Sequence, residues 1–133
     1  MKVIITITES ALPIARTIQR EWLDAEVVRM SDKTFLTEHW KELECVVFVG
    51  AMGICVRTIA PLLNDKYTDP AVICVDSTGK YVIPVVSGHI GGANDYSKRI
   101  AAILGGEAII TTQSDNLGLW AIDTLAQKYG WQT

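Results

Sequence analysis

Residues 85–95, with the sequence V-V-S-G-H-I-G-G-A-N-D, combine groups for proton transfer with groups for binding an anion. His89 is the side chain here that exchanges a proton near neutral pH. Three glycines let the backbone turn sharply and approach a ligand. A helical pattern begins at Ala93, and the start of a helix presents unpaired N–H groups and a positive dipole end. The segment predicts an anion cradle around a general acid or base, although such turns also serve as plain strand-to-helix connections.

The other polar and small residues of this segment are candidate substrate contacts. They are Ser87, Gly88, Gly91, Gly92, Asn94 and Asp95. Asp95 is the second candidate for moving a proton. Helix capping is the alternative role for Asn94 and Asp95, and a hydrogen bond to the backbone is the alternative for His89. Ser87 lacks the G-x-S-x-G context of a serine nucleophile.

A second glycine turn, Gly50-Ala51-Met52-Gly53, follows an apolar run and leads into a helical pattern that carries Arg57. The Arg57 guanidinium can clamp a carboxylate, or it can lie at the surface with its stem over apolar neighbours. Neither turn has the G-x-G-x-x-G spacing or the lysine of the common nucleotide-binding motifs. Ser114 and Asp115 follow the last expected strand and are further candidates for lining a cleft.

Composition excludes several classes of protein. The chain has 133 residues, is 49% hydrophobic and carries a net charge of −3. That charge disfavours a nucleic-acid partner, and no apolar run reaches the ~20 residues of a membrane span. The unpaired spacing of Cys45, Cys55 and Cys74 favours buried free thiols in a reducing cytoplasm. Because the two histidines are distant from each other and from patterned acids, we expect no metal site.

Strand and helix patterns alternate along the chain. The expected strands are residues 2–8, 25–29, 45–49, 71–76, 81–86 and 108–110. Turn residues 77–79 join two of them into a β-hairpin. The pattern predicts an α/β fold, a three-layer α/β/α sandwich with a mostly parallel central sheet and one inserted β-hairpin.

Helices are expected after residues 9–10, 31–32 and 50–53, and over residues 93–104 and 117–129. In the third, which Pro61 should interrupt, Cys55, Val56 and Ile59 are expected to face inward. The last, with Leu117, Trp120 and Leu125, should pack on this sheet or against a second copy in a homodimer.

Ligands of such folds bind at the carboxyl ends of the strands. Both glycine turns follow strands and precede helices. We therefore expect them to face one cleft, which the side chains of His89 and Arg57 both reach.

Four motifs together resemble a known family. They are G-A-M-G-I-C-V-R-T-I-A-P-L-L (50–63), D-P-A-V-I-C-V-D (69–76), S-G-H-I-G-G-A-N (87–94) and I-T-T-Q-S-D (110–115). Their order and spacing are similar to the N-terminal domain of the cobalt-precorrin-5A hydrolases, the CbiG-type proteins of anaerobic cobalamin biosynthesis. The similarity is close over residues 45–115 and looser outside them. It divides the chain into an N-terminal α/β domain (1–115) and the start of a middle segment (116–133), which in the family leads to a C-terminal domain.

The resemblance implies a cobalt-corrinoid substrate with carboxylate arms. The family opens the δ-lactone of cobalt-precorrin-5A with water and releases acetaldehyde, giving cobalt-precorrin-5B. The cobalt belongs to the substrate, so no cofactor is implied. Helix N-termini and Arg57 suit carboxylates, and His89 and Asp95 suit proton transfer. A partial hydrolase is one hypothesis, a non-catalytic corrinoid-binding module serving another domain is a second, and a generic nucleotide- or flavin-binding domain is a third.

Overall fold

The structure, a computed structural model, describes residues 1–22, 24–30, 34–65, 67–87 and 92–111. The strands are β1 (Lys2–Thr6), β2 (Ala25–Arg29), β3 (Cys45–Val49), β4 (Ala71–Val75), β5 (Tyr81–Val86) and β6 (Glu107–Ala108). The α-helices are α1 (Leu12–Glu21), α2 (Thr34–His39), α3 (Met52–Ile59) and α4 (Ala93–Leu104). Short 3₁₀ turns are η1 (Glu9–Ala11), η2 (Trp40–Glu42) and η3 (Ala60–Leu62).

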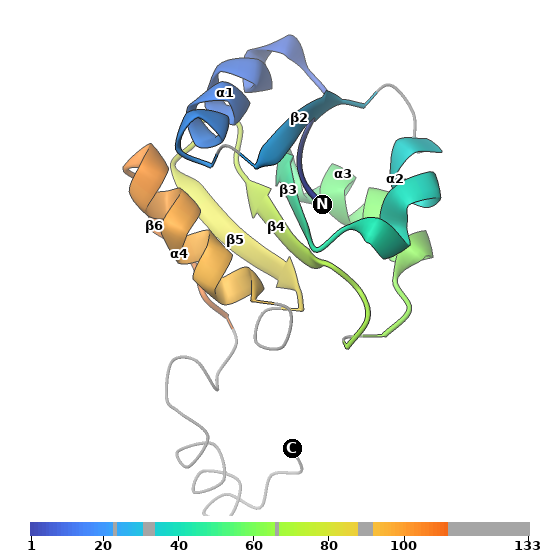
Figure 1. Cartoon of the computed structure of the whole chain (residues 1–133). Coiled ribbons are helices and arrows are strands. Elements are labelled where there is room, and N and C mark those ends of the chain that lie inside the picture. The colour runs from blue at the N-terminus through green and yellow to red at the C-terminus, as the bar shows by residue number, and fades with distance from the viewer. Residues whose placement is uncertain (23, 31–33, 66, 88–91, 112–133) are drawn as a thin grey trace, which may run out of the picture.

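The six strands form one sheet in the order β2-β1-β3-β4-β5-β6 (Figure 1). Strands β1 to β4 are parallel, β5 runs antiparallel to β4, and β6 runs parallel to β5. Every residue of β3 and β4 is buried, as expected for apolar strands covered on both faces. The predicted mostly parallel α/β sandwich with an inserted hairpin is confirmed.

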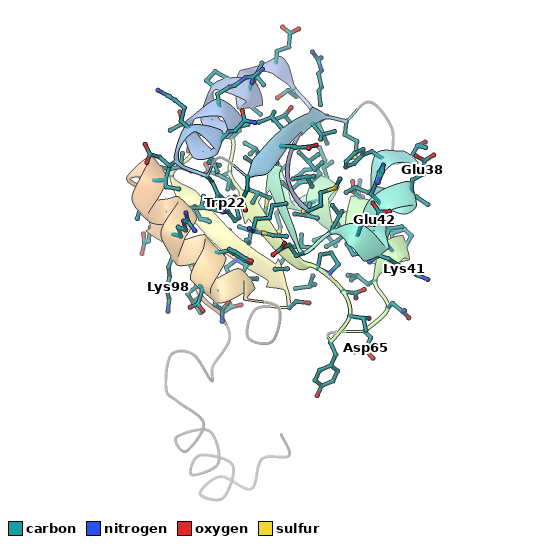
Figure 2. The ribbon with its side chains drawn as sticks, in the orientation of Figure 1. Trp22, Glu38, Lys41, Glu42, Asp65 and Lys98 are labelled. Carbon is teal, nitrogen blue, oxygen red and sulfur yellow. The ribbon has the colours of Figure 1, made fainter. Side chains whose placement is uncertain are left out.

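Helices α1 and α4 cover one face of the sheet, and α2 and α3 cover the other (Figure 1). Ala15 and Ile18 of α1 and Ile100 of α4 are buried in the first core. Trp22, labelled in Figure 2, continues this core after α1, with its ring centroid 5.3 Å from that of Tyr96. The second core is built around side chains of β1, β3 and β4 such as Phe48.

Two details of the third predicted helix have different outcomes. The break at Pro61 is confirmed, because α3 ends at Ile59 and Pro61 lies in η3. The inward position of Val56 is wrong, because its side chain is 44% exposed. Cys55, Thr58 and Ile59 form the buried face of α3, and Val56 lies one residue out of phase with it. The predicted helix over residues 117–129 lies outside the described residues.

The three cysteines are free and buried, as predicted. Burial raises the pKa of the Cys45 thiol to about 12, which keeps it protonated and unreactive. None of the described helices has the length and apolar character that crossing a membrane requires.

We predict that Gly106→Ala destabilises the fold by about 2 kcal/mol, as overpacking does. A Cβ at position 106 would lie 2.5 Å from the backbone oxygen of Lys80, a backbone contact that cannot yield cheaply. Gly53→Ala is the matched control, because a Cβ there meets nothing within 4 Å and alanine favours a helix. Urea unfolding measures both, and equal effects would contradict the prediction.

Candidate functional site

The two glycine turns lie at opposite ends of the strands, which we refer to below as the two edges of the sheet. Val49, which precedes the first turn, pairs with Val75, whereas Val86, which precedes the second, pairs with Val72. Because β5 is antiparallel, its carboxyl end lies beside the amino end of β4. The two pairing positions on β4 are therefore three residues apart, roughly 10 Å along the strand. The prediction that both turns face one cleft is wrong.

The helices that follow the two turns also cover opposite faces. Cys55 and Ile59 of α3 belong to one core, and Ala93 and Ile100 of α4 belong to the other. Gly53 and Arg57, both exposed on α3, thus lie on a different surface from the start of α4. The shared site fails because the hairpin reverses β5, so only β1 to β4 obey the rule that places ligands at the carboxyl ends of parallel strands.

The ends of the second glycine turn are held together by its backbone. The Ala93 N–H donates to the Ser87 carbonyl over 3.2 Å, which brings the two ends side by side. Ser87 has φ of +57°, a left-handed conformation that is costly for a residue with a Cβ. Gly92 has φ of +85°, so the expectation that Gly91 or Gly92 would adopt positive φ is confirmed.

Several predicted site residues lie outside the described residues. They are Gly88, His89, Gly91, Ser114 and Asp115. Their roles remain predictions. The last described strand, β6, runs parallel to β5 and so toward the edge where Ser87 lies.

Asn94 and Ser97 are buried polar side chains in the first two turns of α4. Their exposed fractions are 2% and 0%, and neither the Asn94 amide nor the Ser97 hydroxyl has a hydrogen-bond partner in the described structure. Their spacing of three residues puts them on one face of the helix. Leaving a buried polar group unpaired costs about 1–3 kcal/mol, so the pair is a candidate for a ligand contact.

The capping alternative for Asn94 is wrong. Gly92 occupies the N-cap position of α4, and no side chain caps the helix there. Asp95 lies exposed in the first turn, where its carboxylate suits the positive end of the helix dipole. Its proton-transfer role remains a prediction.

Two hollows share part of their lining, and one of them reaches Ser87; we call them together the loop-edge groove. The smaller, about 280 Å³, is lined by Leu63, Asn64, Asp65, Asp69, Val86 and Ser87. The larger, about 580 Å³, shares Leu63, Asn64 and Asp69 with it and adds Trp40, Lys41, Pro61, Leu62 and Thr68. Lys41 and Asp65 lie on the same flank of the molecule (Figure 2). The lining mixes apolar side chains with polar and charged groups, and ligand sites also combine the two.

Asp69 organises the wall of this groove. One of its carboxylate oxygens accepts the Trp40 indole N–H over 3.1 Å, and the other accepts the backbone N–H groups of Asn64 and Asp65 over 2.8 and 3.1 Å. The Ser87 hydroxyl lies 3.5 Å from the Asp69 carbonyl. The carboxylate thus fixes the segment between η3 and β4 against η2. Sequence reasoning missed the role of Asp69, which it included only as the first residue of a family motif.

Asp76, the last residue of an expected strand, shapes the hairpin at the other edge. Its carboxylate accepts hydrogen bonds from the Thr78 hydroxyl and from the N–H groups of Thr78, Lys80 and Tyr81. Partial burial alone would raise the pKa of Asp76, but these hydrogen bonds outweigh it and hold the pKa below its ordinary value.

No group of three or more histidine, cysteine or acidic residues in the described part of the chain is arranged to hold a metal ion. His39, expected at the surface, has its Nδ1 3.1 Å from the Glu42 carboxylate. The described groups around the second glycine turn are the N–H donors at the start of α4, the buried Asn94 amide and Ser97 hydroxyl, and the carboxylates of the loop-edge groove.

The family described as Cobalamin synthesis G N-terminal matches residues 34–115, more than half of the chain, including both glycine turns and Asp69. The chain belongs to this family. Over 81 residues it is 49% identical to the cobalt-precorrin-5A hydrolase of Salmonella typhimurium, covering 61% of this chain and 23% of that protein. Over 146 aligned positions it is 33% identical to the cobalt-precorrin-5A hydrolase of Priestia megaterium, covering 96% of this chain and 39% of that protein.

A solved structure has the same fold. It is described as a cobalamin biosynthesis protein G homolog from Sulfolobus solfataricus, and it superposes with a TM-score of 0.74 at 27% identity, covering 92% of this chain and 45% of that one. The chain therefore spans less than half the length of these relatives. The family and the names of its members link the chain to cobalamin biosynthesis, and the resemblance found in the sequence is confirmed.

We predict that Asn94→Leu stabilises the isolated chain by about 1 kcal/mol, because it removes an unpaired buried amide at similar volume. If the amide serves a ligand, the same change weakens binding. Ser97→Ala is the companion variant and should behave alike. Chemical unfolding gives the stabilities, and a large destabilisation by either variant would show instead that the amide or hydroxyl has a structural role.

We predict that Asp76→Asn lowers stability at neutral pH by about 2 kcal/mol, the value of hydrogen bonds to a charged acceptor. Since the folded-state pKa lies below the unfolded value of about 3.9, the carboxylate stabilises the fold above about pH 4. That contribution is lost as the pH falls through the folded-state pKa. Unfolding curves from pH 7 to pH 3 should converge for the two proteins, with Ser77→Ala as control, and a constant difference would contradict the assignment.

Proposed function

We propose that this chain forms one wall of the active site of a cobalt-precorrin-5A hydrolase, which adds water to the δ-lactone of a cobalt corrinoid and yields cobalt-precorrin-5B and acetaldehyde. One observation carries the proposal. The family match over residues 34–115 includes the second glycine turn, which begins at the loop-edge groove and ends beside the buried pair Asn94 and Ser97. The cobalt enters with the substrate, and the proposal requires no cofactor held by the chain.

Several groups near the second glycine turn suit the carboxylate arms of a corrinoid, although Asp65 and Asp69 of the groove do not. The first turn of α4 offers N–H donors and a positive dipole end. The Asn94 amide and the Ser97 hydroxyl offer donors that no described residue uses. Lys41, at the far end of the groove, adds a cation, and the apolar walls at Leu62 and Leu63 suit the rim of the macrocycle.

The proposed reaction needs a base, an oxyanion site and a proton carrier. His89 is the candidate base that activates water against the lactone carbonyl, and the N–H groups of Gly91 and Gly92 are candidates for the oxyanion site. Ring opening frees an alkoxide. Its oxygen becomes the carbonyl oxygen of acetaldehyde as the bond to the macrocycle breaks, and the electron pair of that bond passes to the macrocycle carbon. His89 or Asp95 then delivers the proton.

We leave Gly53 and Arg57 out of this site, because neither residue lines the loop-edge groove and Gly53 lies in the glycine turn at the other end of the strands. The size of the substrate explains why one wall is proposed. A corrinoid is a broad plate, and excluding water from the reacting carbon requires a second surface. The relatives named as hydrolases are much longer than this chain, which also favours the second candidate, a corrinoid-binding module that serves another domain.

We predict that residues 1–133 bind cobalt-precorrin-5A but release acetaldehyde far more slowly than the Salmonella enzyme at equal concentration. The visible spectrum of the corrinoid reports binding, and an aldehyde assay reports turnover. Absence of binding would overturn the proposal as a whole. Turnover close to that of the longer enzyme would overturn the one-wall description and place the whole catalytic apparatus in this chain.

We also predict that His89→Ala lowers the acetaldehyde release by this chain by ~10²-fold or more while corrinoid binding persists. The assay is run alone and with the remaining part of the Salmonella enzyme added. His39→Ala is the matched control, because that histidine pairs with Glu42 and lines neither hollow of the groove. Binding with no turnover under either condition would favour the non-catalytic module.

A further inference from the structure

One flank of the sheet has an apolar surface opposite α4. Cys74, which faces the α2 and α3 core, pairs with Ile83, so Ile83 faces the same way. By strand alternation Tyr81 also lies on this face, and Val85 packs at its margin. On β6, Ala108 packs toward α4, so Ile109 points to the opposite face, where it is 37% exposed. We call Tyr81, Ile83, Val85 and Ile109 the β5–β6 flank.

The flank lacks a helical cover in the described part of the structure. Helix α4 packs along β5 and β6 on the other face (Figure 1). Helices α2 and α3 share the face of the flank, but they cover β1, β3 and β4, whose residues dominate their core. The side chains of Tyr81, Ile83 and Val85 are accordingly only half-buried, unlike those of β3 and β4. A partly exposed apolar surface that is continuous with a core can accept a further packing element.

The chain itself leads to this flank. The Ile109 N–H donates to the Val82 carbonyl over 2.9 Å, so the chain still follows β5 after β6. The described residues end at Thr111, and residues 112–133 follow. Their sequence predicts a helix over residues 117–129, in which Leu117, Ala121 and Leu125 recur at intervals of four residues.

The dimensions of that segment fit the flank. A helix of this length is about 20 Å long, and a six-residue strand such as β5 is also about 20 Å long. Residues 112–116 can span at most ~17 Å, which is enough to reverse the chain at the edge of the sheet. A tethered segment also reaches the flank at high effective concentration, whereas a second copy must first lose its translational freedom.

We propose that residues 117–129 form a helix that packs on the β5–β6 flank of the same molecule, with Ala121 and Leu125 facing Ile83 and Ile109. The helix gives β5 and β6 the second layer that α2 and α3 give the other strands. The proposal does not depend on the proposed function.

Cysteine cross-linking in the full chain tests the proposal. Ile109→Cys is combined in turn with Ala121→Cys, Leu125→Cys, Asp123→Cys or Gln127→Cys, the last two on the opposite side of the expected helix. The native cysteines are buried and stay in place. Under mild oxidation, the Ala121 and Leu125 variants should give at least a five-fold higher yield of intramolecular disulfide than the Asp123 and Gln127 variants.

A second series controls for random collisions. It replaces Ile109→Cys by Ala102→Cys, which is exposed on α4 at the other face, and it should show no such preference. Equal yields at all four tail positions, or no cross-link at any, would overturn the proposal. Cross-linked dimers in place of monomers would also overturn it and assign the flank to a second copy. Thermal melting of each reduced variant confirms that the fold is intact.

Discussion

Hydrogen bonding between β4 and an antiparallel β5 determines where the carboxyl-terminal half of this domain lies. The hairpin turn between β4 and β5 is stabilised by hydrogen bonds to the Asp76 carboxylate. It is closed by the 2.9 Å hydrogen bond from the Gly79 N–H to the Asp76 carbonyl. Because of this reversal, the chain runs back along β4 to the opposite end of the strands before the second glycine turn begins. The positions of the second glycine turn and of the start of α4 follow from this reversal, as does the direction of β6. A parallel β5 would have placed the glycine turn and the start of α4 at the opposite end of the strands and reversed β6.

Several unfavourable features gather at that edge. Ser87 has a left-handed backbone, and Asn94 and Ser97 are buried without partners. Each costs free energy that the surrounding cores must offset. Nearby, Asp69 is the opposite case, a carboxylate whose two oxygens are both engaged. Fully hydrogen-bonded groups beside buried groups without partners are expected at a binding site, where function can outweigh local stability.

Most of the fold could be predicted from the sequence, because it depends on local signals. Unbroken apolar runs gave β3 and β4, and the turn around Asp76 gave the hairpin. The arrangement of the site could not be predicted in the same way. Its position depends on strand direction across the whole sheet, and the rule for parallel strands was applied to β5, which is antiparallel.

Smaller errors have equally physical causes. Val56 was assigned to the core because it is apolar, but the phase of α3 turns it outward. Ser97 escaped notice because a serine within a helix carries no strong signal. Its spacing from Asn94, on a face otherwise made of alanine and isoleucine, was the available clue. Asp69 can be recognised only once η2 and η3 are brought together in space.

The three buried thiols allow local opening of the domain to be measured through their reactivity. Cys45 faces the core beneath α1 and α4, whereas Cys55 and Cys74 face the core beneath α2 and α3. A thiol in such a position reacts with an alkylating reagent only when its surroundings open. The rates at which the individual cysteines are alkylated would therefore report the opening of the two layers separately, without any substitution in the chain.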